Sequence, residues 1–203
     1  MYPTEFDLPL SGLDWLEYYP DHRVYHPGVD FNKGYGDQDL GQDIFAPRDG
    51  FVDIVYTGWN HRGFGKFIII KHADGNYTRY AHLGEVLVTE KTNVKEGDLI
   101  AKMGKTGTKY AHLHFEVFNE KMAEIQRKNW YTWRYYPVNK YKQWVIEHYL
   151  NPWEWLKPKD VEMEEALMMN AEWKPKPLIA KPDGSYKTDK EILLILKRFK
   201  DGL

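Results

Sequence analysis

The sequence predicts a mainly β fold built from antiparallel strands, and two observations carry this prediction. Short apolar or alternating runs recur at intervals of roughly ten residues between positions 26 and 118, with glycine-rich turns between them. No long run with a helical period separates these strands, as a fold of alternating strands and helices would require. We therefore expect an antiparallel β-sheet domain, extended by an aromatic, helical insert and a helical C-terminal appendage.

The strands follow from local pattern. The dense apolar run over residues 66–71 is typical of a central strand. Asp74-Gly75 comes next as a hairpin turn, so residues 76–80 are expected to return antiparallel to that strand. The other predictions are a strand over residues 51–56, a turn and strand over residues 94–100, and a last strand over residues 110–118.

Aromatic residues crowd together between Trp130 and Trp155. Residues 140–150 predict a helix here, ended by Asn151-Pro152. The aromatic side chains either form a hydrophobic cap over the sheet, which we favour, or offer flat surfaces on which sugar rings could stack.

The composition predicts two parts for the chain. We expect a first domain over residues 1–156, consisting of a core at 24–118 and the aromatic cap at 119–156. Residues 157–203 differ in their four prolines and are expected to form an appendage. In this appendage Thr188 and Glu191 have the spacing of a capping box, which predicts the start of a helix.

The charge and the cysteine count exclude several classes of function. The 28 basic and 30 acidic residues give a net charge of −2, which provides no electrostatic grip on nucleic acid. The chain has no cysteine, so disulfides, cysteine nucleophiles and iron–sulfur clusters are excluded. Any metal must therefore be held by His, Asp or Glu, and the chain has eight histidines.

The chain carries neither of two membrane-related signals. No apolar run is long enough to span a bilayer. The N-terminus has no basic residue before Arg23 and no apolar stretch of the kind found in secretory signals. Delivery by a route other than secretion and removal of an earlier signal both remain open.

Histidines and acidic residues occur in three local patterns. The first is His26-Pro27-Gly28-Val29-Asp30, in which a Pro-Gly bend could aim an imidazole and a carboxylate at one point. The second places His82 at the end of a predicted strand. In the third, strand alternation puts His112, His114 and Glu116 on one face, opposite Ala111, Leu113, Phe115 and Val117.

Taken singly, each pattern has an ordinary structural interpretation. The third could be the solvated face of a strand, and the first could be a turn with a capping Asp. Together they supply two imidazoles and one carboxylate, the ligand set of a catalytic zinc site with one open position. Two further histidines remain for proton transfer. A cupin-like iron site would also use a His-x-His pair, but it does not explain the other two patterns.

These motifs, in this order, resemble the lysostaphin/LytM-type zinc metalloendopeptidases of bacterial cell walls. The matching segments are His26-Pro27-Gly28-Val29-Asp30, Tyr80-Ala81-His82-Leu83 and His112-Leu113-His114-Phe115-Glu116. Glycine-rich strands at 46–52, 63–70 and 94–107 also match the family pattern, and the resemblance covers roughly residues 24–118.

The resemblance implies a peptidase domain with a groove, a zinc cofactor and a peptidoglycan cross-link or stem peptide as substrate. By the same resemblance His26, Asp30 and His114 are the zinc ligands, and His82 and His112 are the catalytic histidines. Because all five positions are intact, we expect an active enzyme working at the cell wall, in the periplasm or outside the cell. The alternative is a zinc-holding, non-cutting module that binds the wall or activates amidases.

Roles within the site follow as hypotheses. We expect His112 to act as the general base, since strand geometry sets it beside the ligand His114. We expect His82 to support it or to stabilise the developing oxyanion. Family members often carry a tyrosine before the first ligand as an oxyanion donor. Tyr19 and Tyr25 both qualify by position.

Overall fold

Antiparallel strands dominate the part of the chain that the structure describes, which confirms the predicted fold class. The structure is a computed structural model, and it describes residues 1–5, 13–20, 23–34, 36–58, 63–129 and 141–157. These residues all belong to one compact unit, Met1–Lys157.

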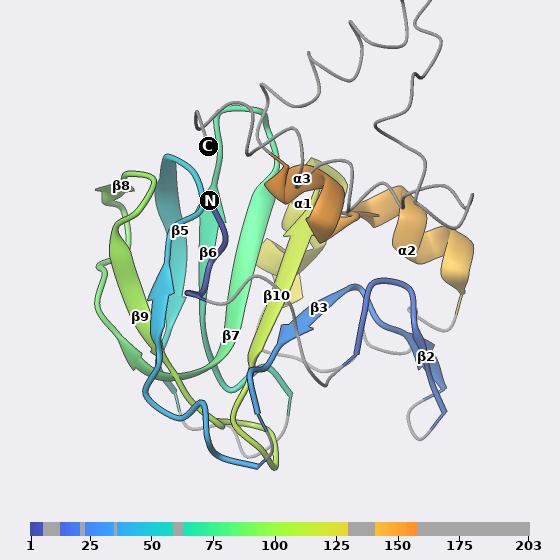
Figure 1. Ribbon diagram of the computed structural model, residues 1–203. Coiled ribbons are helices and arrows are strands. Elements are labelled where there is room, and N and C mark those ends of the chain that lie inside the picture. Colours follow the sequence, from blue (N-terminus) through green and yellow to red (C-terminus); the bar gives the residue numbers. More distant parts are fainter. Residues whose placement is uncertain (6–12, 21–22, 35, 59–62, 130–140, 158–203) are drawn as a thin grey trace, which may run out of the picture. The chain divides into compact units, whose positions relative to one another are not determined.

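A nine-stranded antiparallel sheet is the main element of the described residues (Figure 1). Its continuous path consists of β11 (Tyr149–Leu150), β10 (Leu113–Phe118), β7 (Tyr77–Val86), β6 (Lys66–Lys71), β5 (Gly50–Tyr56) and β8 (Asn93–Val94). Off this path, β3 (Gly28–Phe31) pairs with β10, and β9 (Leu99–Met103) pairs with both β7 and β4 (Asp43–Phe45). A separate hairpin joins β1 (Tyr18–Tyr19) to β2 (Val24–Tyr25).

The strands agree with the predictions in the centre of the sheet and differ from them at some strand ends. Residues 51–56 and 66–71 fall in β5 and β6 as expected, whereas the strand predicted over 76–80 begins at Tyr77 and continues to Val86 as β7. The last strand, however, begins at Leu113 and not at residue 110. His112 therefore precedes the strand, and its direction is set by the loop before β10 and not by strand alternation.

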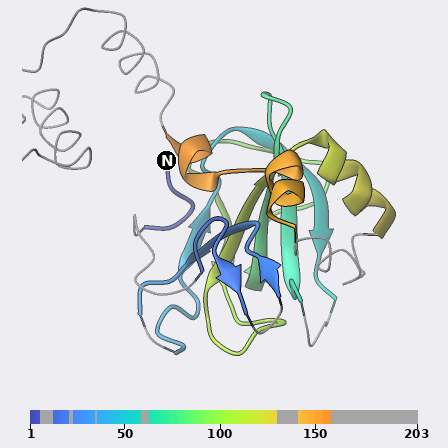
Figure 2. The same cartoon turned by 90° about the vertical axis from the view of Figure 1, so that its right-hand side faces the viewer.

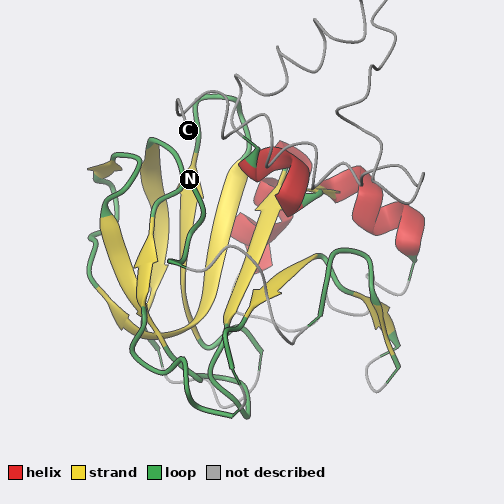
Figure 3. Cartoon of the chain, viewed as in Figure 1, coloured by secondary structure: helices red, strands yellow, loops and turns green. Residues whose placement is uncertain are grey.

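Each face of the sheet packs against a buried hydrophobic core. One face packs a core that includes Tyr80, Phe115 and Trp155. The other face packs a second core, including Phe67 and Phe118, beneath α1 (Glu120–Asn129) and α2 (Lys142–His148). Figure 3 shows the helices on the β10 side of the sheet, away from β8 and β9. Figure 2 shows α1 and α3 on opposite sides of the strands. Polar side chains that point into these two cores, such as Arg79 and Glu116, are therefore shielded from water.

The helix prediction over residues 140–150 was wrong at its C-terminal end. Helix α2 stops at His148, and Asn151-Pro152 begins a further helix, α3 (Pro152–Leu156). The Asn151 side chain accepts a hydrogen bond from the Trp153 backbone N–H at 3.0 Å and so caps α3. Proline at the first helical turn is favourable, because its missing N–H has no partner there in any helix.

Some predictions fall on residues outside the described part. These are the aromatic residues between Trp130 and Tyr136, and the capping box of Thr188 and Glu191. The boundary between a domain at 1–156 and an appendage at 157–203 stays a prediction. Among the described helices, none is long and apolar enough to cross a membrane.

Candidate metal centre

The register of three neighbouring strands brings the motifs together. On one side of β10, His114 pairs with Asp30 of β3, and on its other side it pairs with Ala81 of β7, the residue before His82. The same register sets Gly28 opposite Glu116. A Cβ at Gly28 would lie 2.3 Å from the Phe115 carbonyl oxygen, so only glycine lets β3 approach β10 this closely.

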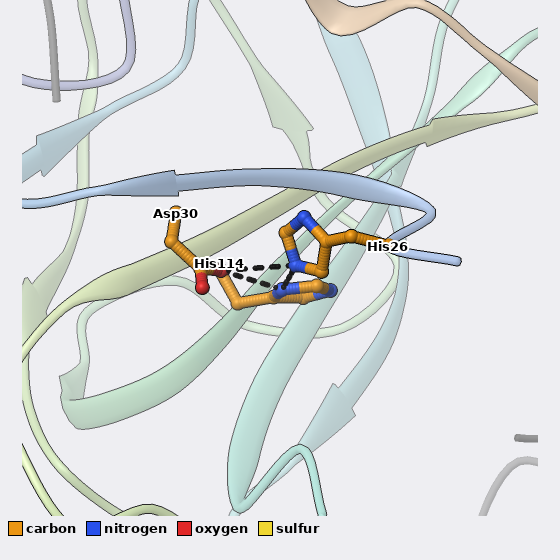
Figure 4. A group of neighbouring side chains, drawn as sticks. All are labelled: His26, Asp30 and His114. Atoms are coloured by element: carbon orange, nitrogen blue, oxygen red, sulfur yellow. Dashed lines mark hydrogen bonds and ion pairs between the residues drawn. The ribbon is translucent and has the colours of Figure 1, made fainter. Parts of the chain in front are cut away.

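Three atoms that could bind a metal, one each from His26, Asp30 and His114, converge at this point (Figure 4). His114 Nδ1 lies 3.0 Å from His26 Nε2 and 2.9 Å from Asp30 Oδ1, and His26 Nε2 lies 3.2 Å from the same Asp30 oxygen. A tetrahedral zinc site with bonds of roughly 2.0–2.1 Å places its donors about 3.3 Å apart. All three residues are buried. Their chemistry and spacing therefore fit a zinc ion with three protein ligands.

The remaining polar atoms of the three residues are held by hydrogen bonds. His26 Nδ1 lies 3.2 Å from the Asp14 carbonyl oxygen, and His114 Nε2 lies 2.9 Å from Glu116 Oε1. Because both partners only accept hydrogen bonds, they favour the tautomers that leave His26 Nε2 and His114 Nδ1 free for a metal. The second Asp30 oxygen accepts a bond from the Leu13 N–H at 3.4 Å.

His82 and His112 lie beside this cluster, with their ring centroids 4.6 Å apart. Each directs Nδ1 at a backbone carbonyl oxygen, that of Thr106 at 2.9 Å for His82 and that of Tyr110 at 3.0 Å for His112. A carbonyl accepts only, so Nδ1 carries the proton and Nε2 is the free nitrogen of each ring. His112 Nε2 lies 3.9 Å from Asp30 Oδ1, next to the cluster.

The backbone of His82 is strained. Its φ is +62°, in the left-handed region that L residues rarely adopt. The ladder between β6 and β7 shifts register close by, between Lys66 and Ile68. Such irregularities redirect side chains, and strained residues concentrate at functional sites. The strain therefore accompanies the turning of His82 toward the cluster.

Burial and neighbouring charges give the histidines of the site different protonation states. Burial lowers the pKa of His82 and of His112, so both rings are neutral at pH 7 and can accept a proton. Burial also disfavours the charged form of His114, but its bonds to Asp30 and Glu116 outweigh this and raise its pKa to about 9. Burial raises the pKa of Asp30, while the surrounding histidines bring it well below its usual value.

All five predicted residues thus lie together: His26, Asp30, His82, His112 and His114. The interpretation of the His-x-His segment as a solvated strand face was wrong, since His114 and Glu116 are buried between strands. The roles assigned to the five residues stay predictions.

The remaining described histidines have structural contacts elsewhere. His72 is buried and lies between the Asp49 carbonyl oxygen at 2.9 Å and the Thr78 hydroxyl at 2.8 Å. His148 stacks on Trp144 with their ring centroids 4.0 Å apart. His22 and His61 lie outside the described residues.

Sequence reasoning missed three contributors. The Asp14 and Thr106 carbonyls act through the backbone, so no side-chain signal could have revealed them. Arg79 donates to Glu116 at 2.7 Å, and neither side chain is exposed. The position of Arg79 between Tyr77 and Ala81 on one strand face indicated a buried charge. Its partner could not be identified without the pairing of β7 with β10.

An antiparallel β-sheet that carries a buried His/Asp/His cluster fits a metallopeptidase domain. The model of peptidase family M23 matches residues 24–127, just over half of the chain, and the chain belongs to this family.

Curated relatives carry names from murein metabolism. Murein hydrolase activator NlpD of Salmonella typhimurium is 51% identical over 120 residues, covering 56% of this chain and 30% of the relative. Murein hydrolase activator NlpD of Escherichia coli is 51% identical over 77 residues, covering 38% of this chain and 20% of the relative. The chain therefore spans less than a third of the length of these relatives.

Two of the solved structures that match this chain are a zinc containing peptidase and the catalytic domain of lysostaphin. A zinc containing peptidase from Vibrio cholerae is 33% identical, with a TM-score of 0.48, and the match covers 57% of this chain and 35% of that chain. The catalytic domain of lysostaphin from Staphylococcus simulans is 29% identical, with a TM-score of 0.44, and the match covers 52% and 77%.

Proposed function

We propose that the chain is a zinc-dependent endopeptidase that hydrolyses peptide bonds in bacterial peptidoglycan. One observation carries the proposal: a buried set of three ligand atoms lies beside two neutral histidines whose free Nε2 atoms are available for proton transfer. A merely structural metal site is closed by four protein ligands, whereas a catalytic site keeps one position open.

His26, Asp30 and His114 would hold the zinc ion. When bound there, zinc supplies a water of lowered pKa and polarises the peptide carbonyl. The chain itself must accept the proton of that water and pass it to the leaving amine. His112 is the better placed base, because its Nε2 lies 3.9 Å from the ligand oxygen of Asp30.

His82 would complement this role. Its ring is held by the Thr106 carbonyl, and its Nε2 is the second proton acceptor at the cluster. The Thr106 hydroxyl donates to the Leu83 carbonyl at 2.9 Å and accepts from the Lys66 N–H at 2.9 Å, which fixes the loop that carries this carbonyl. His82 can therefore hold one orientation while charge develops on the substrate.

The peptidoglycan substrate and a place of action in the cell envelope are supported by the relatives, whose names refer to murein hydrolysis. A specific bond in the peptide is not implied by these names. Mass spectrometry of muropeptides released from walls of several chemotypes would identify the bond.

The same relatives favour a second candidate function. They are named activators of murein hydrolases, which fits a domain that binds a cell-wall amidase and stimulates it without cutting peptide bonds. In that case the His/Asp/His cluster would serve structure, and the two neutral histidines would have no proton to move.

Clearing of purified sacculi separates the two functions. The purified chain, its His26→Ala variant and the chain with a chelator are compared, each with and without an added amidase. Clearing by the chain alone, lost in the variant and with chelator, supports the endopeptidase. Stimulation of the amidase by both the chain and His26→Ala, without clearing by either alone, supports the activator and contradicts our proposal.

A further inference from the structure

A buried chain of polar contacts runs away from the metal-facing side of His114. His114 Nε2 lies 2.9 Å from Glu116 Oε1, and Glu116 Oε2 accepts a bond from Arg79 Nη1 at 2.7 Å. One oxygen of the Glu116 carboxylate therefore contacts His114 and the other contacts Arg79. Arg79 and Glu116 pair directly across β7 and β10, and so the sheet register itself fixes this contact.

Arg79 lies in surroundings that are unusual for a cation. Its guanidinium carbon lies 4.0 Å from the ring centroid of Phe64, and Phe67 and Phe118 are within 5.5 Å. Its Nε and Nη2 atoms have no hydrogen-bond partner among the described residues. The aromatic faces offset part of the desolvation cost, and Glu116 supplies the only opposite charge bonded to it in the described structure.

Stability alone does not account for this pair. Replacing a buried ion pair by apolar side chains of similar size is often neutral or stabilising. What an apolar pair cannot do is accept a hydrogen bond from His114. A carboxylate only accepts, so when the ring is neutral it requires the remaining proton to be on Nε2. Nδ1, the nitrogen that faces Asp30 and His26, is then available to a metal.

We propose that Arg79 is a positioning residue for the metal site: it orients Glu116, and Glu116 in turn selects the His114 tautomer that presents Nδ1 to the metal. This inference rests on the proposed zinc site but not on peptide hydrolysis.

A glutamine at position 116 tests the orientation directly. The arginine only donates, so it would bind the amide oxygen and turn the amide NH₂ group toward His114 Nε2. That NH₂ group also only donates, and it requires an unprotonated Nε2. The neutral ring would then carry its proton on Nδ1, where the metal must bind. Glu116→Gln is therefore expected to weaken zinc binding although its shape is conserved.

Removing the cation should reverse this effect. In Arg79→Met/Glu116→Gln the amide is free to rotate, and its oxygen can accept from Nε2 again. In the matched control Arg79→Lys/Glu116→Gln a donor remains in place, and the amide stays in the unfavourable orientation. A purely structural pair predicts no such difference between methionine and lysine.

The experiment measures zinc affinity of the full chain by competition with a chromophoric chelator. We expect Glu116→Gln and the lysine double variant to bind zinc roughly 10- to 100-fold more weakly than the unmodified chain, with the methionine double variant recovering about tenfold. Circular dichroism records the folded fraction. Equal affinities for the two double variants, or for Glu116→Gln and the unmodified chain, overturn the proposal.

A second measurement needs no variant at position 116 or 79, and it serves if Glu116→Gln fails to fold. Imidazole ¹⁵N NMR of the zinc-loaded chain, assigned with His114→Ala, should show a protonated Nε2 and a metal-bound Nδ1 for His114. A protonated Nδ1 overturns the proposal. If the unmodified chain binds no zinc, the proposed site itself fails, and that result is distinct from equal binding by all variants.

Discussion

His82 and His112 have the same hydrogen-bonding arrangement. Each ring donates a hydrogen bond from Nδ1 to a backbone carbonyl oxygen. The two ring centroids are 4.6 Å apart, beside the ligand cluster. Neither side chain is one of the three converging ligand groups. If the proposed site is correct, metal binding and proton transfer fall to different residues, and substitutions can test them separately.

The first prediction uses this separation. His112→Ala should retain zinc, because His26, Asp30 and His114 are unchanged, and should lose about 10²- to 10⁴-fold in the rate of peptide hydrolysis. His114→Ala should lose both zinc and activity. Zinc content by atomic absorption and hydrolysis of purified sacculi are measured on the same samples. A His112→Ala variant that clears walls at the unmodified rate would rule out its role as the base.

The second prediction concerns the strained backbone of His82. At an ordinary φ, alanine is more favourable than glycine, but at φ +62° a Cβ costs roughly 1–2 kcal/mol. His82→Gly and His82→Ala remove the same ring contacts, so their difference isolates this strain. We expect His82→Gly to have the larger free energy of unfolding, by about 1 kcal/mol in urea denaturation. Greater stability for His82→Ala would mean that the position is not strained.

The third prediction is a pH dependence. The pKa of His114 is about 9 in the metal-free fold, above its usual value, because its bonds to Asp30 and Glu116 outweigh the effect of burial. A raised pKa stabilises the fold below about pH 6.5, the pKa of an unfolded histidine, and this contribution disappears as the pH rises toward 9. The free energy of unfolding of the metal-free chain should therefore contain a term that decreases between these values.

Zinc binding should show the opposite dependence. The ion must displace the proton from His114 Nδ1, so zinc affinity should rise with pH until about pH 9. Calorimetric titration at pH 7 in buffers of different ionisation enthalpy should detect proton release, which declines above pH 9. Binding at pH 7 without proton release would contradict this assignment.

Local pattern was sufficient to predict the central strands. Residues 66–71 are a dense apolar run because β6 is buried on both faces, and the Asp74-Gly75 turn fixed its partner β7. The family resemblance, more than geometry, selected the five residues of the site. Their convergence depends on β3 pairing with β10, between segments more than 80 residues apart, and no local pattern contains that register.

Each difference from the predictions has a specific structural cause. Asn151-Pro152 is compatible with the end of one helix and with the start of the next, and the contact that decides between them is the Asn151 cap on Trp153. His112 lies beside the cluster as expected, but strand alternation is not the reason, because β10 begins one residue after it, at Leu113. The contact of Arg79 with Glu116 could not be inferred from local pattern, because the two residues are 37 positions apart.

The last prediction tests the two interpretations of the aromatic segment at one of its residues, Trp155. Trp155 is only 6% exposed and its Nε1 donates to Asp74 at 2.9 Å, while the Arg48 guanidinium lies 3.9 Å above its ring. These contacts attach α3 to the sheet, as expected of a hydrophobic cap. Trp155→Ala should therefore cost roughly 3–5 kcal/mol of unfolding free energy.

Two matched variants sharpen this test. Trp155→Phe keeps most of the buried surface and loses the Asp74 bond, so it should cost about 1 kcal/mol. Ile146→Ala, on the exposed side of α2, should change stability by less than about 0.5 kcal/mol. If Trp155 instead served glycan stacking, its removal would weaken binding to purified walls and leave the urea midpoint unchanged. Because the ring is already covered by Arg48 and His72, we expect the loss to appear in stability.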